Sequence, residues 1–211
     1  MGISQRILRP TFVTAAIAAL ILTAGCAPSG AAEPAVGAAE SGARASTPEA
    51  TRAMLDGLGL DSADPAALAT GLDALAVDSR TAEFSAAIMP GEIRVQPDQP
   101  GELVIPVPED QFYLSVAPYR TQTHPCTFHV PTSCLGELRS VDAQLRVTDL
   151  ATGDVVVDRE VRTEDNGFVG VWLPRDGDFT VEMTVDGDTG SQVVRTGAND
   201  PTCLTTLQLN A

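Results

Sequence analysis

The cysteines and histidines are the residues of this chain whose types and spacing could support chemistry. Both histidines, His124 and His129, lie in one short segment that also carries Cys126 and Cys134, and Cys203 follows near the end of the chain. Thiolate and imidazole bind Cu(I) or zinc in preference to calcium and magnesium, which prefer oxygen ligands. These five side chains are therefore the candidate metal ligands.

The spacing of the thiols leaves other interpretations open. Exported proteins usually pair their cysteines, so a Cys126–Cys134 disulfide with Cys203 buried would be a purely structural arrangement. That arrangement suits a thiol–disulfide module, or an Ig-like scaffold, without a physiological metal. A mixed Cys/His set also suits zinc, which makes a zinc-binding lipoprotein a further alternative. Titration of the free thiols separates the scaffold from a metal carrier, because a carrier needs reducible thiols.

The N-terminus has the features of a bacterial export signal. Arg6 and Arg9 precede an apolar run that is too short to span a membrane, which needs roughly 20 residues. The run ends in Leu-Thr-Ala-Gly-Cys at 22–26, which resembles a lipobox. We expect residues 1–25 to be a lipoprotein signal peptide and Cys26 to carry the lipid. The protein would then be extracytoplasmic and anchored to the cell membrane.

The charge of the chain excludes some classes of partner. Its 28 acidic residues outnumber its 13 basic ones and give a formal net charge of −15. Such a charge repels nucleic acid and favours the attraction of cations, without identifying any one cation. No Ser-His-Asp arrangement or phosphate-binding loop stands out in the sequence, so a hydrolase is not favoured.

A tether and two helices are predicted ahead of the thiols. Residues 26–47 have almost no large apolar side chain, which is typical of a flexible tether. Thr47-Pro48-Glu49 and Asp64-Pro65 each combine an N-cap residue with a proline at the first helical position. We therefore expect a small helical region over residues 48–82.

The pattern changes at residue 83 to short β-prone runs bounded by Gly, Pro and Asp. This change predicts an α+β fold, in which a short N-terminal helical pair precedes an antiparallel β-sandwich or barrel-like domain over residues 83–211. The expected strands are 83–88, 91–96, 101–107, 111–117, 141–148, 154–162, 167–173, 178–185, 190–195 and 203–209.

Residues 118–140 interrupt the succession of strands. They show no clear periodicity, contain several prolines, and hold both histidines and two of the thiols. A loop of about 20 residues without secondary structure is uncommon unless it is functional, disordered or fastened by other parts of the chain. This loop is therefore the candidate site.

The loop and three nearby strings resemble the CueP family of periplasmic copper-binding proteins. The strings are DQFYLSVAPY at 110–119, DNGFVGVWLP at 165–174 and PTCLTTLQL at 201–209. The resemblance spans roughly residues 50–211, and its strings recur in order around all three thiols. The lipid anchor expected at Cys26 departs from the soluble setting for which the family is best known.

The resemblance implies a protein that serves copper resistance or copper trafficking outside the cytoplasm. The three cysteines of the family fall on Cys126, Cys134 and Cys203, which would bind Cu(I) as thiolates. His124 and His129 are further candidate ligands that would bind as copper enters or leaves. Expected partners are an exported copper enzyme or a thiol reductant, and a homodimer is compatible with the sequence.

The odd number of thiols adds one expectation about redox chemistry. Two thiols would reduce Cu(II) and close a disulfide that contains Cys203, while the third sulfur holds the product. Such a bridge requires the two Cα atoms to lie within about 7 Å of each other. Cupric reduction is therefore the one enzyme activity that the sequence suggests.

Overall fold

The computed structural model describes residues 47–210. The expected signal peptide, the lipidation site Cys26 and nearly all of the expected tether lie outside these residues. No helix between residues 47 and 210 is long and apolar enough to cross a membrane. The elements are α1 (Pro48–Gly57), α2 (Pro65–Ala74), the 3-10 helix η1 (Val77–Ser79), β1 (Ala86–Ile88), β2 (Glu92–Val95), β3 (Leu103–Pro106), β4 (Gln111–Val116), β5 (Asp142–Asp149), β6 (Val155–Arg162), β7 (Val169–Pro174), β8 (Asp178–Val185), β9 (Asp188–Arg195) and β10 (Cys203–Leu204).

Both α-helices begin at the caps that the sequence predicts. Thr47 Oγ1 accepts a hydrogen bond from the backbone N–H of Ala50 at 3.2 Å. Asp64 Oδ1 accepts from the backbone N–H groups of Ala66 and Ala67 at 2.9 and 3.1 Å. These bonds satisfy N–H groups that have no partner within the helix. The start of α2 matters most, because this helix carries a buried residue of the site.

The helices and the first three strands share one hydrophobic core. β1, β2 and β3 form an antiparallel sheet in that order. The buried apolar side chains of this core are Leu55, Leu60, Leu68, Ala69, Leu72, Phe84, Ala86, Ile88, Ile93, Val95, Leu103, Ile105, Val107 and Tyr113. The first strands after residue 83 thus pack with the helices.

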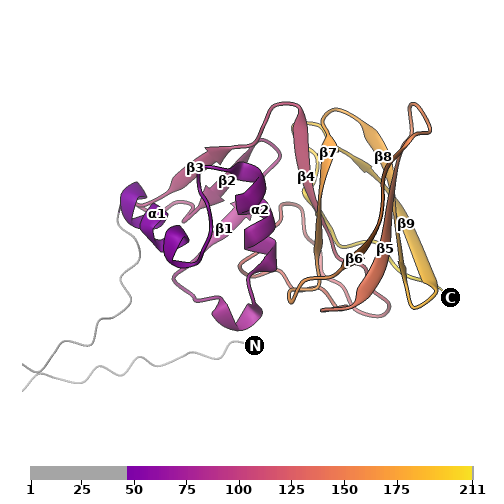
Figure 1. The fold of residues 1–211 in the computed structure, drawn as a ribbon, viewed down its shortest axis with the longest axis horizontal. Coiled ribbons are helices and arrows are strands. Elements are labelled where there is room, and N and C mark those ends of the chain that lie inside the picture. The colour runs from indigo at the N-terminus through magenta and orange to yellow at the C-terminus, as the bar shows by residue number, and fades with distance from the viewer. Residues whose placement is uncertain (1–46, 211) are drawn as a thin grey trace, which may run out of the picture. The chain divides into compact units, whose positions relative to one another are not determined.

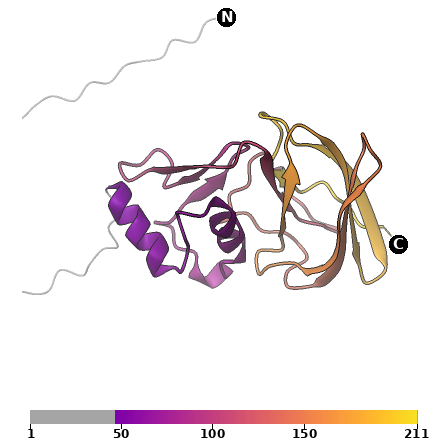
Figure 2. The ribbon, with the colours of Figure 1, turned by 45° about the horizontal axis from the view of Figure 1, so that its top comes forward.

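The remaining strands form two facing sheets (Figures 1 and 2). One sheet has the order β10-β4-β7 and the other has the order β6-β5-β8-β9. Inward-facing side chains alternate along β5 and β8, as expected for sheets with one buried face. The α+β class and the sandwich-like arrangement are confirmed, and the described sheets do not close into a barrel.

Strand β4 joins the two cores because both of its faces are buried. Phe112, Leu114 and Val116 point into the core between the two sheets. Tyr113 and Ser115 point to the opposite face, and both of their hydroxyl groups hydrogen-bond a carboxylate of α2. The strand therefore positions polar groups on one face while its other face packs the sandwich.

The last strand differs from its prediction in length and direction. β10 has two residues, and it pairs parallel with β4, so that Cys203 lies opposite Ser115. Beyond it, single bridges join Gln208 to Tyr119 and Asn210 to Thr189. The predicted strand 203–209 cannot stay in one ladder, because this segment crosses from the sheet of β4 to that of β9.

The long loop between β4 and β5 is fastened rather than structureless. The Glu137 carboxylate accepts backbone N–H bonds from Arg120 at 2.6 Å, Thr121 at 3.0 Å and Gln122 at 3.3 Å. The hydroxyl of Thr121 donates to the same carboxylate at 2.5 Å. Further along, the Gly136 N–H donates to the Asn166 carbonyl at 2.7 Å. Both ends of the loop are thereby tied down.

The clamp formed by Glu137 predicts a specific pH dependence of stability. The hydrogen bonds from Thr121 lower the pKa of Glu137 from 4.5 to about 2, although partial burial opposes the shift. A depressed carboxylate pKa contributes stability above pH 4.5 that is lost as the pH falls through about 2. Glu137→Gln should therefore cost about 1 kcal/mol at pH 7, discounted for solvent exposure.

Denaturant unfolding of wild type and Glu137→Gln between pH 7 and pH 2 measures this effect. The difference between them should shrink below pH 4.5 and vanish near pH 2. Glu109→Gln is the control, because Glu109 is exposed. Equal stability of Glu137→Gln and wild type at pH 7 would contradict the clamp.

Candidate metal centre

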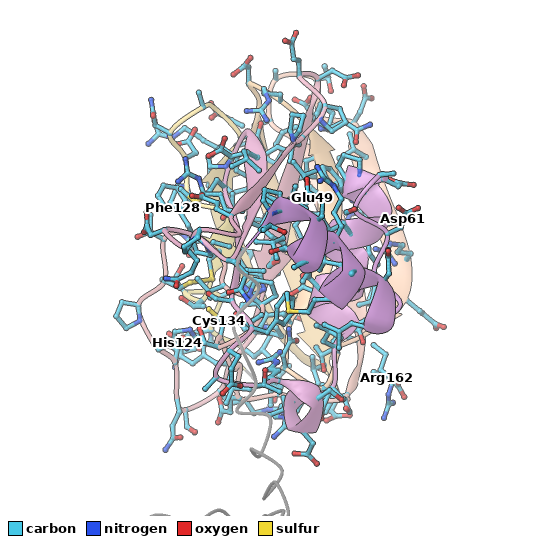
Figure 3. All side chains as sticks on the ribbon, turned by 90° about the vertical axis from the view of Figure 1, so that its left-hand side faces the viewer. Glu49, Asp61, His124, Phe128, Cys134 and Arg162 are labelled. Atoms are coloured by element: carbon cyan, nitrogen blue, oxygen red, sulfur yellow. A yellow bond between two sulfur atoms is a disulfide. The ribbon has the colours of Figure 1, made fainter. Side chains whose placement is uncertain are left out.

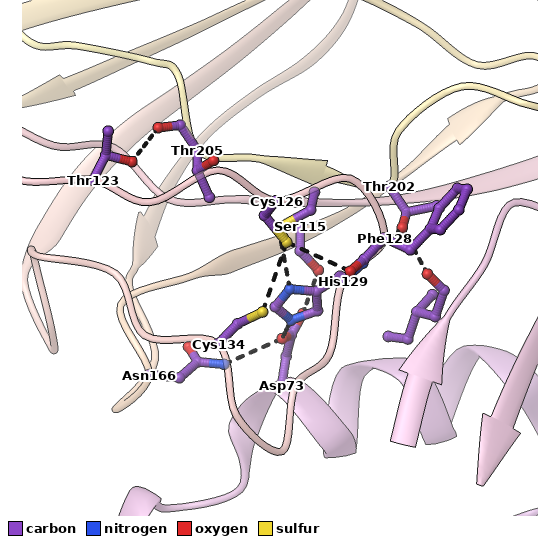
Figure 4. The surroundings of a disulfide bond; sticks show 12 residues. Asp73, Ser115, Thr123, Cys126, Phe128, His129, Cys134, Asn166, Thr202 and Thr205 are labelled. Atoms are coloured by element: carbon purple, nitrogen blue, oxygen red, sulfur yellow. Dashed lines mark hydrogen bonds and ion pairs between the residues drawn. A yellow bond between two sulfur atoms is a disulfide. The ribbon is translucent and has the colours of Figure 1, made fainter. Parts of the chain in front are cut away.

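The three thiols of the described chain meet at one point (Figure 4). Cys126 and Cys203 form a disulfide across 77 residues of sequence, with their Cα atoms 5.7 Å apart. Cys134 is free and half-buried, and its Sγ lies 3.7 Å from the Sγ of Cys126. The pairing is therefore not the local Cys126–Cys134 bridge that the spacing left open, and the disulfide contains Cys203.

The backbone around Thr202 holds the loop against the end of the chain. The N–H groups of Thr202 and Cys203 both donate to the carbonyl of Thr127, at 3.0 and 3.3 Å. Thr202 Oγ1 donates to the Ile88 carbonyl at 2.6 Å and accepts from the backbone N–H of His129 at 3.0 Å. One hydroxyl thus connects β1, the loop and the last strand, and it fixes the position of the His129 backbone.

His129 is fully buried, with 0% of its surface exposed. Its Nε2–H donates to Asp73 Oδ1 at 2.6 Å, and its Nδ1 lies 3.6 Å from Cys203 Sγ. The ring packs on Phe168 with centroids 4.5 Å apart. A histidine that ligates a metal commonly donates its other ring N–H to a carboxylate, which fixes the tautomer and the orientation of the ring. The geometry of His129 fits this arrangement.

Asp73 of α2 is the buried carboxylate that orients His129. Its Oδ1 also accepts from Asn166 Nδ2 at 3.2 Å, and its Oδ2 accepts from the hydroxyls of Tyr113 at 2.7 Å and Ser115 at 2.9 Å. Four donors therefore surround a side chain that is only 2% exposed. A buried charge is tolerated in a protein core only when it is paired and hydrogen-bonded in this way.

The charges of this network shift the pKa values of its members. Burial opposes ionisation of Asp73, but the charge and hydrogen bond of His129 outweigh it and lower the pKa of the carboxyl. Burial likewise disfavours the imidazolium, yet Asp73 raises the pKa of His129 to about 9. Burial raises the pKa of the Cys134 thiol, and the hydrogen bond and charge of His129 reverse this into a net lowering. Cys134 is thus favoured as a thiolate, the form that binds metal.

Three glycines make the close contacts of the site possible. A Cβ on Gly170 of β7 would lie 1.8 Å from the Tyr113 hydroxyl, so a side chain there would displace Tyr113 from Asp73. Gly136 and Gly167 press their backbones together, and a Cβ on either would meet the other at 2.7 to 2.8 Å. The loop segment after Cys134 can approach the turn at Asn166 only because both positions lack side chains.

The candidate ligands form two overlapping groups. The inner group comprises His129, Cys134 and Cys203, and the outer group comprises His124, Cys126 and Cys134. Within each group the ligand atoms lie within 4.8 Å of one another. His124 and Cys134 are labelled side by side in Figure 3. All five residues singled out from the sequence are thus brought together, and each group combines sulfur with one imidazole nitrogen.

The sequence reasoning missed the residues that support these ligands. Asp73 is an acid on the buried face of α2, one turn after Ala69. That helical spacing was the available signal, since an acid on an apolar face needs a partner. Tyr113 packs in the core shared with the helices and also donates to Asp73. Asn166 lies in the turn before β7, and its side chain donates to Asp73.

Removing the charge of Asp73 tests its structural role. Asp73→Asn keeps the shape of the side chain, but it leaves buried His129 without its ionic partner and points donors at Tyr113 or Ser115. Breaking a buried ion pair on one side typically costs about 3–5 kcal/mol. We expect a loss of this size in denaturant unfolding, against almost none for Asp78→Asn, which changes an exposed acid nearby. Equal stability of the two variants would show that the pair at Asp73 contributes little.

Comparisons with known proteins agree with the geometry of the site. A search among curated proteins gives no match. The family model of the periplasmic copper-binding protein CueP matches residues 68–208. The chain also resembles the protein in a structure described as "Crystal Structure of S.CueP", with 36% sequence identity and a TM-score of 0.67. That alignment covers 75% of this chain and 96% of the other. The chain therefore belongs to the CueP family of periplasmic copper-binding proteins.

Proposed function

We propose that the reduced protein binds one Cu(I) ion through the thiolates of Cys126, Cys134 and Cys203, with nitrogen supplied by the two histidines. The observation that carries this proposal is the convergence of three sulfurs from two distant segments around one buried imidazole. Soft thiolates select Cu(I), and no carboxylate of residues 47–210 belongs to either group of candidate ligands. Membership of a copper-binding family supports copper over zinc as the physiological metal.

The supporting residues favour a preorganised ligand set. The Asp73–His129 bond leaves His129 Nδ1 facing the sulfurs, and the lowered pKa of Cys134 favours its thiolate. An imidazole that is already oriented and a thiol that is favoured as thiolate lose less free energy when the metal binds, while the proton on His129 Nδ1 leaves as the metal takes its place. Copper is the cargo here, so the chain's own contribution is to select, orient and release it.

The main rival is a structural disulfide without a physiological metal. The Cys126–Cys203 bond, which ties the loop to β10, is the observation that favours this rival. A disulfide that only staples the fold would resist reduction, and its loss would destabilise the protein by about 2–5 kcal/mol. A copper carrier instead needs the bond to open readily under mild reducing conditions.

Cupric reduction follows from the same pair of sulfurs. When the Cys126–Cys203 bond forms, the two thiols lose two electrons and two protons. Two Cu(II) ions accept these electrons and become two Cu(I) ions, so the step is balanced without another reactant. Cys134 keeps its thiolate and can hold one of the products. An external dithiol reductant would reopen the disulfide for the next cycle.

The protein acts outside the cytoplasm, as its family does. We further propose that Cys26 carries a lipid that anchors the chain to the membrane, and that copper passes to an exported copper enzyme. If residues 26–47 act as a tether, the copper-binding part can contact partners near the membrane surface.

The proposed function predicts, first, the Cu(I) affinity of the protein and its variants. Reduced wild-type protein should bind one Cu(I) more tightly than zinc in competition with a coloured chelator, under anaerobic conditions. Cys126→Ser, Cys134→Ser and Cys203→Ser should each weaken binding by about 100-fold or more, because each removes a sulfur ligand. Ser133→Ala is the matched control in the same loop. Unchanged affinity in the triple cysteine variant would overturn the proposal.

The second prediction concerns reduction. Cu(II) added to the reduced protein should yield two Cu(I) per molecule and a Cys126–Cys203 disulfide, as read by chelator absorbance and peptide mapping. Cys134→Ser should still reduce Cu(II), whereas Cys126→Ser should not close this bridge. If Cu(II) stays unreduced while all three thiols remain titratable, the protein is a carrier without reductase activity.

The third prediction concerns the anchor. Cells that express the full chain should incorporate labelled fatty acid into it, and Cys26→Ala should abolish the label and the usual processing of the leader. Cys134→Ser is the control, because it removes a thiol from the folded part instead. A wild-type protein that takes up no fatty acid and is released in soluble form would contradict lipidation.

A further inference from the structure

The inner and outer groups of ligands differ in exposure and share one thiol. In the inner group His129 and Cys203 are buried, whereas all three members of the outer group are half-buried. Cys134 belongs to both groups, and its Sγ lies 3.7 Å from the outer sulfur of Cys126. A metal ion bound to Cys134 can therefore bind the remaining ligands of either the inner or the outer group.

His124 has no evident structural role within the described chain. Its Nε2 is buried, yet it has no hydrogen-bond partner among residues 47–210. The ring of His124 contacts Phe168 with centroids 6.4 Å apart. The ring of His129 contacts the same phenyl ring. A buried nitrogen without a partner costs about 1–3 kcal/mol, so its presence calls for a partner that arrives during function.

A surface hollow leads to His124 from the solvent. It has a volume of about 200 Å³ and is lined by residues that include Gln122, His124, Leu135 and Glu137. Glu137 is held in the loop by backbone N–H groups and contributes a negative charge to this opening. A negative charge at the mouth of a hollow raises the local concentration of cations. Of the five candidate ligands, His124 is the one that lines this hollow.

We propose that the outer group is a transit site through which Cu(I) enters and leaves, with His124 as its nitrogen ligand, and that the inner group retains the ion. This inference rests on the proposed function, because it requires that the reduced thiols bind Cu(I). During transfer the ion stays on Cys134. Cys126 also remains bound, the bond from the ion to His124 breaks, and bonds to His129 and Cys203 form. The retained ion then has three sulfurs and one nitrogen as ligands, and its oxidation state does not change.

The disulfide controls both sites at once. Cys126 belongs to the outer group and Cys203 to the inner group, so their bond removes one thiolate from each. The oxidised protein would accordingly lose its transit site and its retention site together. Oxidation would therefore weaken both sites and leave Cys134 as the single thiolate among the five candidate ligands.

Transfer kinetics separate the roles of the two histidines. The full mature chain is reduced, loaded with one Cu(I), and mixed with an excess of a coloured Cu(I) chelator in a stopped-flow instrument; uptake is followed in reverse. His124→Ala should slow uptake and release by a similar factor of about 10, and leave the equilibrium affinity within about twofold. Removing a transit ligand raises the barrier in both directions and leaves the end states unchanged.

His129→Ala should behave differently, with an affinity at least about 10-fold weaker that arises mainly from faster release. His124→Gln, which keeps much of the size of the side chain, must reproduce His124→Ala. Gln122→Ala, in the same hollow but outside the group, should leave rates and affinity unchanged. Wild-type rates in both His124 variants would overturn the transit site.

A weakened affinity in the His124 variants equal to that of His129→Ala would also overturn it, because His124 would then be a ligand of a single site. Absence of Cu(I) binding by the wild-type protein would remove the proposed function and the transit site together. Wild-type rates or a weakened affinity in the His124 variants would leave the proposed function standing, so the transit site and the proposed function can be tested separately.

Discussion

The buried bond between Asp73 and His129 is the interaction on which the rest of the site depends. Asp73 and His129 are almost fully buried and only 2.6 Å apart, so each makes the burial of the other tolerable. Tyr113, Ser115 and Asn166 complete the hydrogen bonds of the carboxylate, which brings α2, β4 and the turn before β7 to one point. Without this pair, the side-chain polar groups of Tyr113, Ser115 and Asn166 would lose the carboxylate that they bond, and their burial would become costly.

The same bond links the fold to the chemistry of the thiols. The charge of Asp73 raises the pKa of His129, and the positive ring in turn lowers the pKa of Cys134. A carboxylate on a helix thus influences a sulfur on a loop without touching it. The two-faced strand β4 makes this possible, because one face packs the sandwich while the other presents hydroxyl groups to the helix.

Much of this structure was predictable from local patterns, and the rest depends on contacts between distant segments. Prolines after N-cap residues located both helices, and alternating apolar residues located the strands, since these signals depend on nearby residues. The ligand types and their clustering in one loop pointed to the site. The choice of Cys203 over Cys134 as partner of Cys126 depends on the parallel pairing of β10 with β4. It joins cysteines 77 residues apart, which no local pattern encodes. Helical spacing places Asp73 on the apolar face of α2, but its partners Tyr113 and His129 lie far along the sequence, so local patterns do not identify them.

The central claim is that copper is held by sulfur in this family member. The most direct test is the copper X-ray absorption spectrum of the reduced protein loaded with one Cu(I). The account predicts an edge typical of Cu(I) and a first coordination shell dominated by sulfur, which loses sulfur in Cys134→Ser and keeps it in Ser133→Ala. A first shell made only of nitrogen and oxygen, unchanged by Cys134→Ser, would contradict it.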